Sequence, residues 1–258
     1  GSTYGLEDGT KGLNNRFVKE ARDVIVYETN PDEISNIVIT LFKNDKSIVL
    51  VEGKDYVVNK ISKAGEWFKY EYIIYATNFM EDGTYHISIY SEDKAGNIAE
   101  NNLDVKNVEI NFGVDKTLPK VIVTNLESKQ TYPVDKLSVL MQATDNMKLV
   151  NIMVELDGKL IASWDEEQII QMGADLQDFV FDIIGDSTHA HTVTITLTDV
   201  AGNQCIETIS DFYVTTNLWV QFVNNKLLFY GSIAAVIGGG IVFIPLWRRR
   251  RRRREARG

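Results

Sequence analysis

The sequence predicts an all-β chain with two tandem β-sandwiches, followed by a single transmembrane α-helix. An internal repeat of alternating apolar and polar residues predicts the sandwiches, and an uncharged C-terminal stretch predicts the helix. Short strands bounded by turn residues favour a sandwich over a fold of alternating strands and helices. We assign residues 3–113 to a first module, 118–215 to a second module, 227–247 to the membrane helix and 248–258 to a cytoplasmic tail.

Two segments of the body match closely. YHISIYSEDKAGN runs from Tyr85 to Asn97, and HTVTITLTDVAGN runs from His191 to Asn203. Such self-similarity is typical of duplicated modules. In each segment the apolar residues recur at every second position, which predicts a strand with one buried face that ends in a turn. The turn residues of this signature are Asp93, Gly96, Asn97, Asp199, Gly202 and Asn203.

A second pair of alternating segments supports the duplication, because Ile34–Leu41 resembles Leu149–Leu156 and precedes the first pair in both modules. Further stretches rich in β-branched and aromatic residues predict strands. They are Val24–Tyr27, Trp67–Tyr75, Val121–Thr124, Leu137–Ala143 and Phe179–Ile184. Acidic residues before an apolar cluster predict one short helix within residues 165–178, and we expect no other helix outside the membrane.

The stretch LLFYGSIAAVIGGGIVFIPLW, from Leu227 to Trp247, carries no charge. As a helix it would be about 31 Å long, which matches the hydrocarbon core of a bilayer. A buried helix of a soluble domain is the less favoured alternative, because such helices are rarely this free of polar residues. By the positive-inside rule, the arginines that follow place the N-terminus outside and the C-terminus in the cytoplasm. These residues are Arg248, Arg249, Arg250, Arg251, Arg252, Arg253 and Arg254.

Within this span, Gly231, Ala235 and Gly239 recur at every fourth position. Small residues on one face allow two membrane helices to approach closely, so a helix–helix contact is one interpretation. The alternative is that glycine and alanine are simply common in membrane helices.

Charge is distributed unevenly along the chain. From Lys226 onward there are nine basic residues and one acid, a net charge of +8, whereas the rest has 18 basic and 35 acidic residues, a net charge of −17. An acidic body repels nucleic acid, so we expect the lipid bilayer, and not nucleic acid, as a partner. Cys205 is the only cysteine, so no disulfide within the chain can form and each sandwich must be held by its core.

The Asp-x-Ala-Gly-Asn signature, present twice, and VDKTLPKV at Val114–Val121 carry a resemblance to a known family. Residues 3–215 resemble the bacterial immunoglobulin-like (Big-type) repeats of surface proteins from Gram-positive, clostridial-type bacteria. The resemblance implies an immunoglobulin-like sandwich of about seven strands per module. It also implies a role as stalk, spacer or adhesive unit without catalysis. The segment before Tyr85 is similar to the tyrosine corner of such domains, whereas the second module has His191 at this position.

Two groups of residues suggest metal binding, and each has a simpler interpretation. His189 and His191 share one strand face, but zinc needs three or four ligands. We therefore favour the interpretation that both histidines are exposed to solvent at the start of a strand. His86 is expected to face solvent. Asp115 with Asp93 or Asp145 offers oxygens suited to calcium, but a turn-forming role of the aspartates is favoured. We therefore expect no cofactor, with calcium as the alternative.

Motifs for a nucleophile elbow, a phosphate loop or a dinucleotide turn do not occur in the sequence, so we expect no enzyme activity. The favoured function is that of a membrane-anchored cell-surface stalk or adhesin segment, which displays upstream domains away from the membrane. The alternative is a module that recognises an extracellular protein or glycan of a host. Exposed Trp67, Phe68 and Trp164 side chains would favour this alternative.

Overall fold

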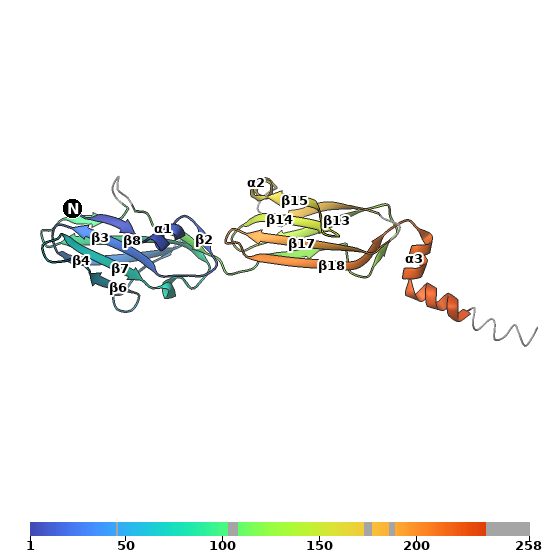
Figure 1. Cartoon of the computed structure of the whole chain (residues 1–258), viewed down its shortest axis with the longest axis horizontal. Helices are drawn as coiled ribbons and strands as arrows, with labels where there is room; N and C mark the ends of the chain where they lie inside the picture. Colours follow the sequence, from blue (N-terminus) through green and yellow to red (C-terminus); the bar gives the residue numbers. More distant parts are fainter. Residues whose placement is uncertain (45, 103–107, 173–176, 186–188, 236–258) are drawn as a thin grey trace, which may run out of the picture.

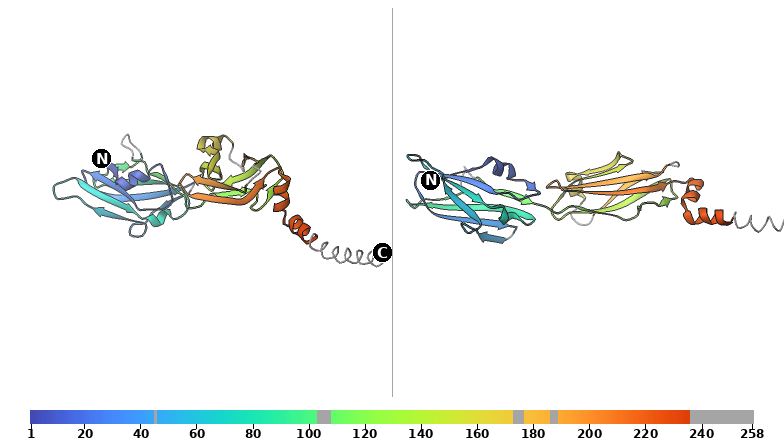
Figure 2. Two further views of the ribbon diagram at one scale, coloured as in Figure 1. Left: turned by 45° about the vertical axis from the view of Figure 1, so that its right-hand side comes forward. Right: turned by 60° about the horizontal axis from the view of Figure 1, so that its bottom comes forward.

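The computed structural model describes residues 1–44, 46–102, 108–172, 177–185 and 189–235. Two β-sandwiches lie end to end, and short helices follow the second one (Figure 1). Two further views show the same arrangement, with the N-terminus at the end of the first sandwich that faces away from the second (Figure 2). The predicted all-β architecture is confirmed for the described part of the two modules.

The first module contains two sheets, with strand orders β1-β3-β7-β6 and β2-β10-β8-β4-β5, and β9 pairs with β8. Its strands are β1 (Thr3–Leu6), β2 (Phe17–Val18), β3 (Val24–Asn30), β4 (Ile34–Lys43), β5 (Lys46–Val49), β6 (Tyr56–Lys60), β7 (Phe68–Ile74), β8 (Gly83–Asp93), β9 (Ile98–Glu100) and β10 (Asn111–Val114). Its helices are α1 (Asp8–Leu13) and the 3₁₀-helix η1 (Ala76–Phe79).

The second module also contains two sheets, with strand orders β11-β13-β16 and β12-β18-β17-β14-β15. Its strands are β11 (Lys120–Val123), β12 (Thr131–Tyr132), β13 (Lys136–Thr144), β14 (Leu149–Leu156), β15 (Lys159–Asp165), β16 (Gln177–Ile184), β17 (His191–Asp199) and β18 (Gln204–Val214). Helix α2 (Glu166–Gln171) lies between β15 and β16, and α3 (Leu218–Asn224) follows β18.

The two modules have the same strand connectivity. The matched segments Ile34–Leu41 and Leu149–Leu156 fall on β4 and β14, which pair with the equivalent strands β8 and β17. In each module a two-residue strand runs parallel to the last strand, as β2 does to β10 and β12 to β18. Two packed sheets with otherwise antiparallel pairing and this strand order form an immunoglobulin-like sandwich.

Each core forms because apolar residues alternate along the strands. In β3, Val24 and Val26 are fully buried, and in β8 the same holds for Ile87 and Ile89. The side chains of Val193, Ile195 and Leu197 on β17 fill the second core in the same way. Burying each such side chain stabilises the fold by about 1.5–3 kcal/mol. The interior of each sandwich is apolar enough to hold without a disulfide, and Cys205 is a free, half-buried thiol.

The sequence predicted one helix within 165–178, and the structure places α2 there. Asp165 accepts a hydrogen bond from the backbone of Gln168, whose side chain bonds back to Asp165, so a capping box starts the helix. The expectation of no other helix outside the membrane was wrong, because α1, η1 and α3 also form. The N-terminus of α3 is capped by Asn217, which the prediction overlooked.

Residues 226–235 are helical up to the end of the described chain. Within the described ranges, no helix is both long and apolar enough to cross a membrane. The predicted span 227–247 extends beyond these ranges, and so do Gly239 and all of Arg248–Arg254. Gly231 and Ala235 lie on the helical segment, and a Cβ atom added to Gly231 would have no neighbour within 4 Å.

Candidate functional site at the module junction

Five residues, 115–119, connect the last strand of the first module to the first strand of the second. The register of β8 with β10 places Gly83 opposite Val114, so the loop before β8 lies at this connection. In the second module, β13 and β17 both end at the connection, because Lys120 pairs with Thr144 and Leu149 pairs with Asp199. The junction therefore combines the linker with three turns.

Asp82 fastens the linker to the first module. One of its carboxylate oxygens accepts a hydrogen bond of 2.9 Å from the backbone N–H of Lys116, and the other accepts one of 2.6 Å from the hydroxyl of Thr117. The amide of Asn146, from the second module, donates to the latter oxygen at 3.1 Å. Burial opposes ionisation of Asp82, but the donors from Thr117, Lys116 and Asn146 outweigh it and hold the pKa of this carboxyl below its usual value.

Asn203 fastens the linker to the second module. Its buried side-chain amide donates to the backbone oxygen of Asp115 at 2.9 Å, to that of Thr117 at 3.4 Å and to the carboxylate of Asp199 at 2.7 Å. Two of these three acceptors belong to the linker. The repeat signature thus contributes a side chain that holds the junction, in addition to forming a turn.

The equivalent turn of the first module lies at the opposite end of that module, where β8 ends. Here Asp93 accepts hydrogen bonds of 2.9 Å from the backbone of Ala95 and Asn97, and the Asn97 amide also donates to it. Gly96 and Gly202 both have a φ of +85°, which the absence of a Cβ atom permits. The suggested grouping of Asp93 with Asp115 is therefore wrong, because these residues lie at opposite ends of the module.

Three aspartates converge on the second-module side of the junction. The carboxylates of Asp115, Asp145 and Asp199 each place an oxygen within 4.8 Å of the others. Asp115 and Asp199 are buried, and Asp145 is half-buried. Burial, together with the charges of Asp145 and Asp199, raises the pKa of Asp115. The sequence suggested Asp115 with Asp145, whereas it assigned Asp199 to the turn signature and not to this group.

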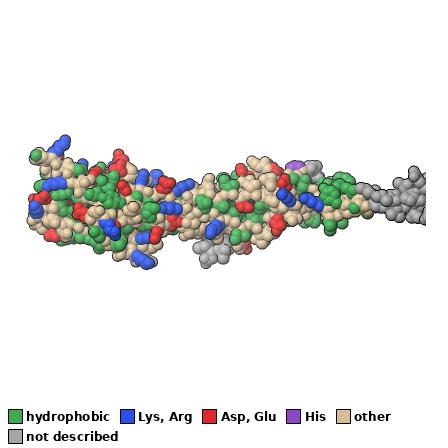
Figure 3. Space-filling model, turned by 90° about the horizontal axis from the view of Figure 1, so that it is seen from below, with side chains coloured by type: hydrophobic (Ala, Val, Ile, Leu, Met, Phe, Trp, Pro, Cys, Tyr) green, Lys and Arg blue, Asp and Glu red, His purple; other side chains and the backbone are tan. Residues whose placement is uncertain are grey.

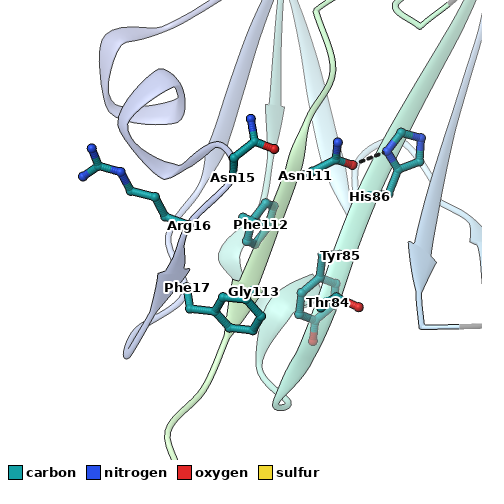
Figure 4. A pocket seen from close by; sticks show the side chains of 9 residues that line it. All are labelled: Asn15, Arg16, Phe17, Thr84, Tyr85, His86, Asn111, Phe112 and Gly113. Atoms are coloured by element: carbon teal, nitrogen blue, oxygen red, sulfur yellow. Dashed lines mark hydrogen bonds between the residues drawn. The ribbon is translucent and has the colours of Figure 1, made fainter. Parts of the chain in front are cut away.

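The hydroxyl of Tyr85 donates to the backbone oxygen of Glu81 at 2.6 Å, which is the contact of a tyrosine corner. The Tyr85 ring also lines an open groove of about 360 Å³ in the first module (Figure 4). Gly113 lies in this groove, and because it has no side chain the ring of Phe17 can pack against its backbone, where a Cβ atom would lie 2.2 Å from the ring. The other lining residues are Asn15, Arg16, Thr84, His86, Asn111 and Phe112.

His86 does not simply face solvent as predicted. Its Nδ1 lies 2.6 Å from the amide oxygen of Asn111 (Figure 4). Its ring centroid lies 5.5 Å from that of Phe42. The imidazole in this groove is therefore bonded to an amide and not to a hydroxyl, thiol or carboxylate. This geometry offers no nucleophile activated by a neighbouring base.

The prediction that both histidines are exposed to solvent was wrong for His191. This side chain is 4% exposed, its Nδ1 lies 2.7 Å from a carboxylate oxygen of Asp157, and its ring packs against Phe212. Burial opposes ionisation of Asp157, but the hydrogen bond with His191 helps to hold the pKa of this carboxyl below its usual value. His189 is exposed and joins Asp157 and His191 as a second group with metal-ligand atoms. In the second module the residue aligned with Tyr85 is thus a buried histidine that contacts Asp157.

No family model and no curated protein sequence matches the chain. Among solved structures it is similar to fibronectin(III)-like modules of Clostridium thermocellum CbhA, with 12% identity over 84% of this chain and 96% of that one and a TM-score of 0.35. It is also similar to dimeric latent PorU from Porphyromonas gingivalis, with 12% identity over 84% of this chain and 24% of that one and a TM-score of 0.32. The N-terminal Ig1-2 module of the Drosophila receptor protein tyrosine phosphatase DLAR shows 14% identity over 78% of this chain and 95% of that one, with a TM-score of 0.26. The immunoglobulin-like fold of this chain is established by its own strand order.

Proposed function

We propose that this chain is a non-catalytic, membrane-anchored stalk that displays upstream domains away from a cell surface. The observation that carries the proposal is the bonded junction. A stalk needs modules that keep their direction, and here Asp82 and Asn203 fasten the same short linker to both modules. Pro119, with its fixed φ, further restricts the linker.

The C-terminal segment supports anchoring. In the helical residues 226–235, large apolar side chains face outward, with Leu227 85% and Leu228 57% exposed. A run of exposed leucines is unfavourable in water and favourable in lipid. The arginines that follow residue 247 are suited to the cytoplasmic side of the membrane. A bacterial surface protein of the Big-repeat type combines these features, and we extend the proposal to that class.

The surface supports a spacer over a binding module. Basic and acidic side chains are mixed over both modules on the face shown in Figure 3. Of the aromatic candidates, Trp164 packs edge-on against Phe179 at a centroid distance of 5.2 Å, and Phe68 packs against the first core beneath the ammonium of Lys60. Trp67 alone is exposed, at 61%. The three candidates therefore do not form an exposed aromatic cluster, whereas hot spots for a ligand cluster.

Cysteine labelling in cells tests the topology. In a Cys205→Ser background, Lys63→Cys places a thiol on an exposed loop of the first module, and Gly258→Cys places one at the C-terminus. A membrane-impermeant maleimide should label Lys63→Cys in intact bacterial cells, and Gly258→Cys only after permeabilisation. Equal labelling of both in intact cells, or recovery of the chain in the soluble fraction, would contradict the anchored orientation.

Energy transfer from an N-terminal dye to acceptor dyes in a nanodisc tests the display role. The longest strand of the second module, β18, has 11 residues, which corresponds to roughly 35 Å at about 3.3 Å per residue. Deleting residues 118–215 should therefore bring the donor closer to the membrane by a distance of this order. Unchanged transfer would show that the modules lie flat or fold back, and would contradict the stalk.

A further inference from the structure

Helix α3, which follows the second module, turns its apolar face away from the protein. Four large apolar side chains share this face because of their helical spacing. They are Leu218, Trp219, Phe222 and Val223. Leu218 is 78% exposed and Trp219 is 68% exposed. On the other side of the helix, the amide of Gln221 donates to the backbone oxygen of Thr215 at 3.0 Å, so this polar side faces the sandwich.

This orientation is the reverse of that of an amphipathic helix in a soluble domain, which turns its apolar stripe toward the core. Hydrogen bonds at the start of α3 hold it. The side-chain oxygen of Asn217 accepts from the N–H of Trp219 at 3.0 Å and from that of Val220 at 3.4 Å. The backbone N–H of Asn217 donates to the hydroxyl of Thr215 at 3.1 Å. An exposed apolar face that is fixed in this way marks a contact with an apolar partner.

The chain bends between α3 and the next helical segment. Asn225 has a φ of −78° and a ψ of 89°, which are not helical values. Its side-chain oxygen accepts from the N–H of Leu228 at 3.2 Å and so caps the segment that begins at residue 226. The two helical segments run in different directions (Figure 2). This bend allows α3 to lie along a membrane surface while the following segment enters the membrane.

Aromatic rings line the bend. The ring centroids of Trp219 and Phe222 lie 5.8 Å apart, and Phe222 lies 5.8 Å from Phe229 of the next segment. Phe229 in turn lies 5.6 Å from Tyr230. Tryptophan and tyrosine rings are enriched where the headgroups of a bilayer meet its acyl chains. The sequence of α3, LWVQFVN, carries no charge, so its outer face offers no ion pair to a charged protein surface.

The length of the connection limits how far α3 can lie from a membrane. Two residues, Asn225 and Lys226, separate α3 from Leu227, where the uncharged stretch begins. At about 3.8 Å between consecutive Cα atoms, this connection spans at most about 11 Å. The headgroup layer on each side of a bilayer is about 5–8 Å thick. A chain that enters the hydrocarbon core at Leu227 therefore holds the end of α3 in the headgroup layer or directly above it.

We infer that α3 is an interfacial helix, which lies in the headgroup layer of the outer leaflet with its apolar face in lipid. The inference rests on the proposed membrane anchor and adds a second contact with lipid. Strand β18 leads into α3, so this contact restricts the tilt of the second module on the membrane. Lipid is the favoured partner because interfacial helices bury tryptophan, phenylalanine and leucine side chains at the boundary between headgroups and acyl chains.

Quenching of tryptophan fluorescence by brominated lipids tests the inference on the full chain in nanodiscs. One variant keeps Trp219 as its only tryptophan, with phenylalanine in place of the others, and a second variant keeps only Trp247. We expect lipids brominated near the headgroup to quench Trp219 more strongly than lipids brominated near the ends of the acyl chains. Quenching of Trp247 without quenching of Trp219 would overturn the interfacial helix and leave the anchor intact. Absence of quenching in both variants would refute the anchor and, with it, this inference.

Leu218→Gln combined with Val223→Gln should lower the quenching of Trp219 by about twofold or more, because the membrane affinity of an interfacial helix scales with its buried apolar area. The matched control is Ile48→Gln combined with Val49→Gln, which removes two exposed apolar side chains from β5 and should leave the quenching unchanged. Circular dichroism establishes that both variants are folded. No loss in the first variant, or an equal loss in both, would overturn the assignment. Quenching of Trp219 that disappears when two chains share one nanodisc would assign the face to a second copy and would also overturn it.

Discussion

Replacing Asn203 by alanine tests whether the junction contributes free energy of its own. The substitution removes the bond to Asp199 within the turn and the two contacts to the linker, at 2.9 Å to Asp115 and 3.4 Å to Thr117. The shorter contact matters more, because the Asp115 residue is fully buried and its carbonyl loses this donor. Leaving a buried acceptor without a donor costs about 1–3 kcal/mol.

The matched control is Asn97→Ala, which removes the same turn contact to Asp93 in the first module but touches no linker. Urea denaturation of the full chain in nanodiscs, followed by circular dichroism, gives the free energy of unfolding for each variant. Asn203→Ala should lose about 1–3 kcal/mol more than Asn97→Ala. Losses that agree within about 0.5 kcal/mol would refute the claim that the junction bonds stabilise the chain.

Three further predictions concern single contacts. Tyr85→Phe keeps the ring but removes the bond to Glu81, so urea denaturation should show a loss of about 0.5–1.5 kcal/mol, and no change would exclude a working tyrosine corner. Because the pKa of Asp157 is lowered in the folded protein, its contact with His191 should stabilise the second module fully above about pH 4. This stabilisation should decrease as the pH falls further, because the carboxylate then becomes protonated. Asp157→Asn should therefore flatten the acid limb of stability against pH, and an unchanged limb would contradict this. Hydrogen bonds and charges of two lysines lower the pKa of Glu33 to about 2, so its carboxyl resonance should titrate near that value, and titration near 4.5 would show that the pairs do not form in solution.

The strands were predictable because their signal is local. Alternation along Tyr85–Asn97 and His191–Asn203 follows directly from the requirement that one strand face is buried, and the structure buries those faces. The duplicated topology followed from the order of the matched segments. The tyrosine corner was indicated by the segment before Tyr85, a residue that lies at the start of β8.

The contacts between distant segments were not predictable in this way. The burial of His191 depends on Asp157 from another hairpin, and the acidic cluster depends on the linker and two turns, which meet only in the folded chain. Helix α1 was missed because DGTKGL contains two glycines and lacks apolar periodicity. It forms because the Glu7 side chain caps it and Leu13 is buried in the first core.

The stiffness of the junction is measured most directly by the distance distribution between two spin labels, one on each module. In a Cys205→Ser background, Ser47→Cys on β5 and Glu207→Cys on β18 place labels at exposed strand positions. Double electron–electron resonance on the full chain in nanodiscs should give one narrow distance distribution, which broadens in Asn203→Ala. A broad distribution in the parent chain, equal to that of Asn203→Ala, would contradict a junction that holds the two modules in line.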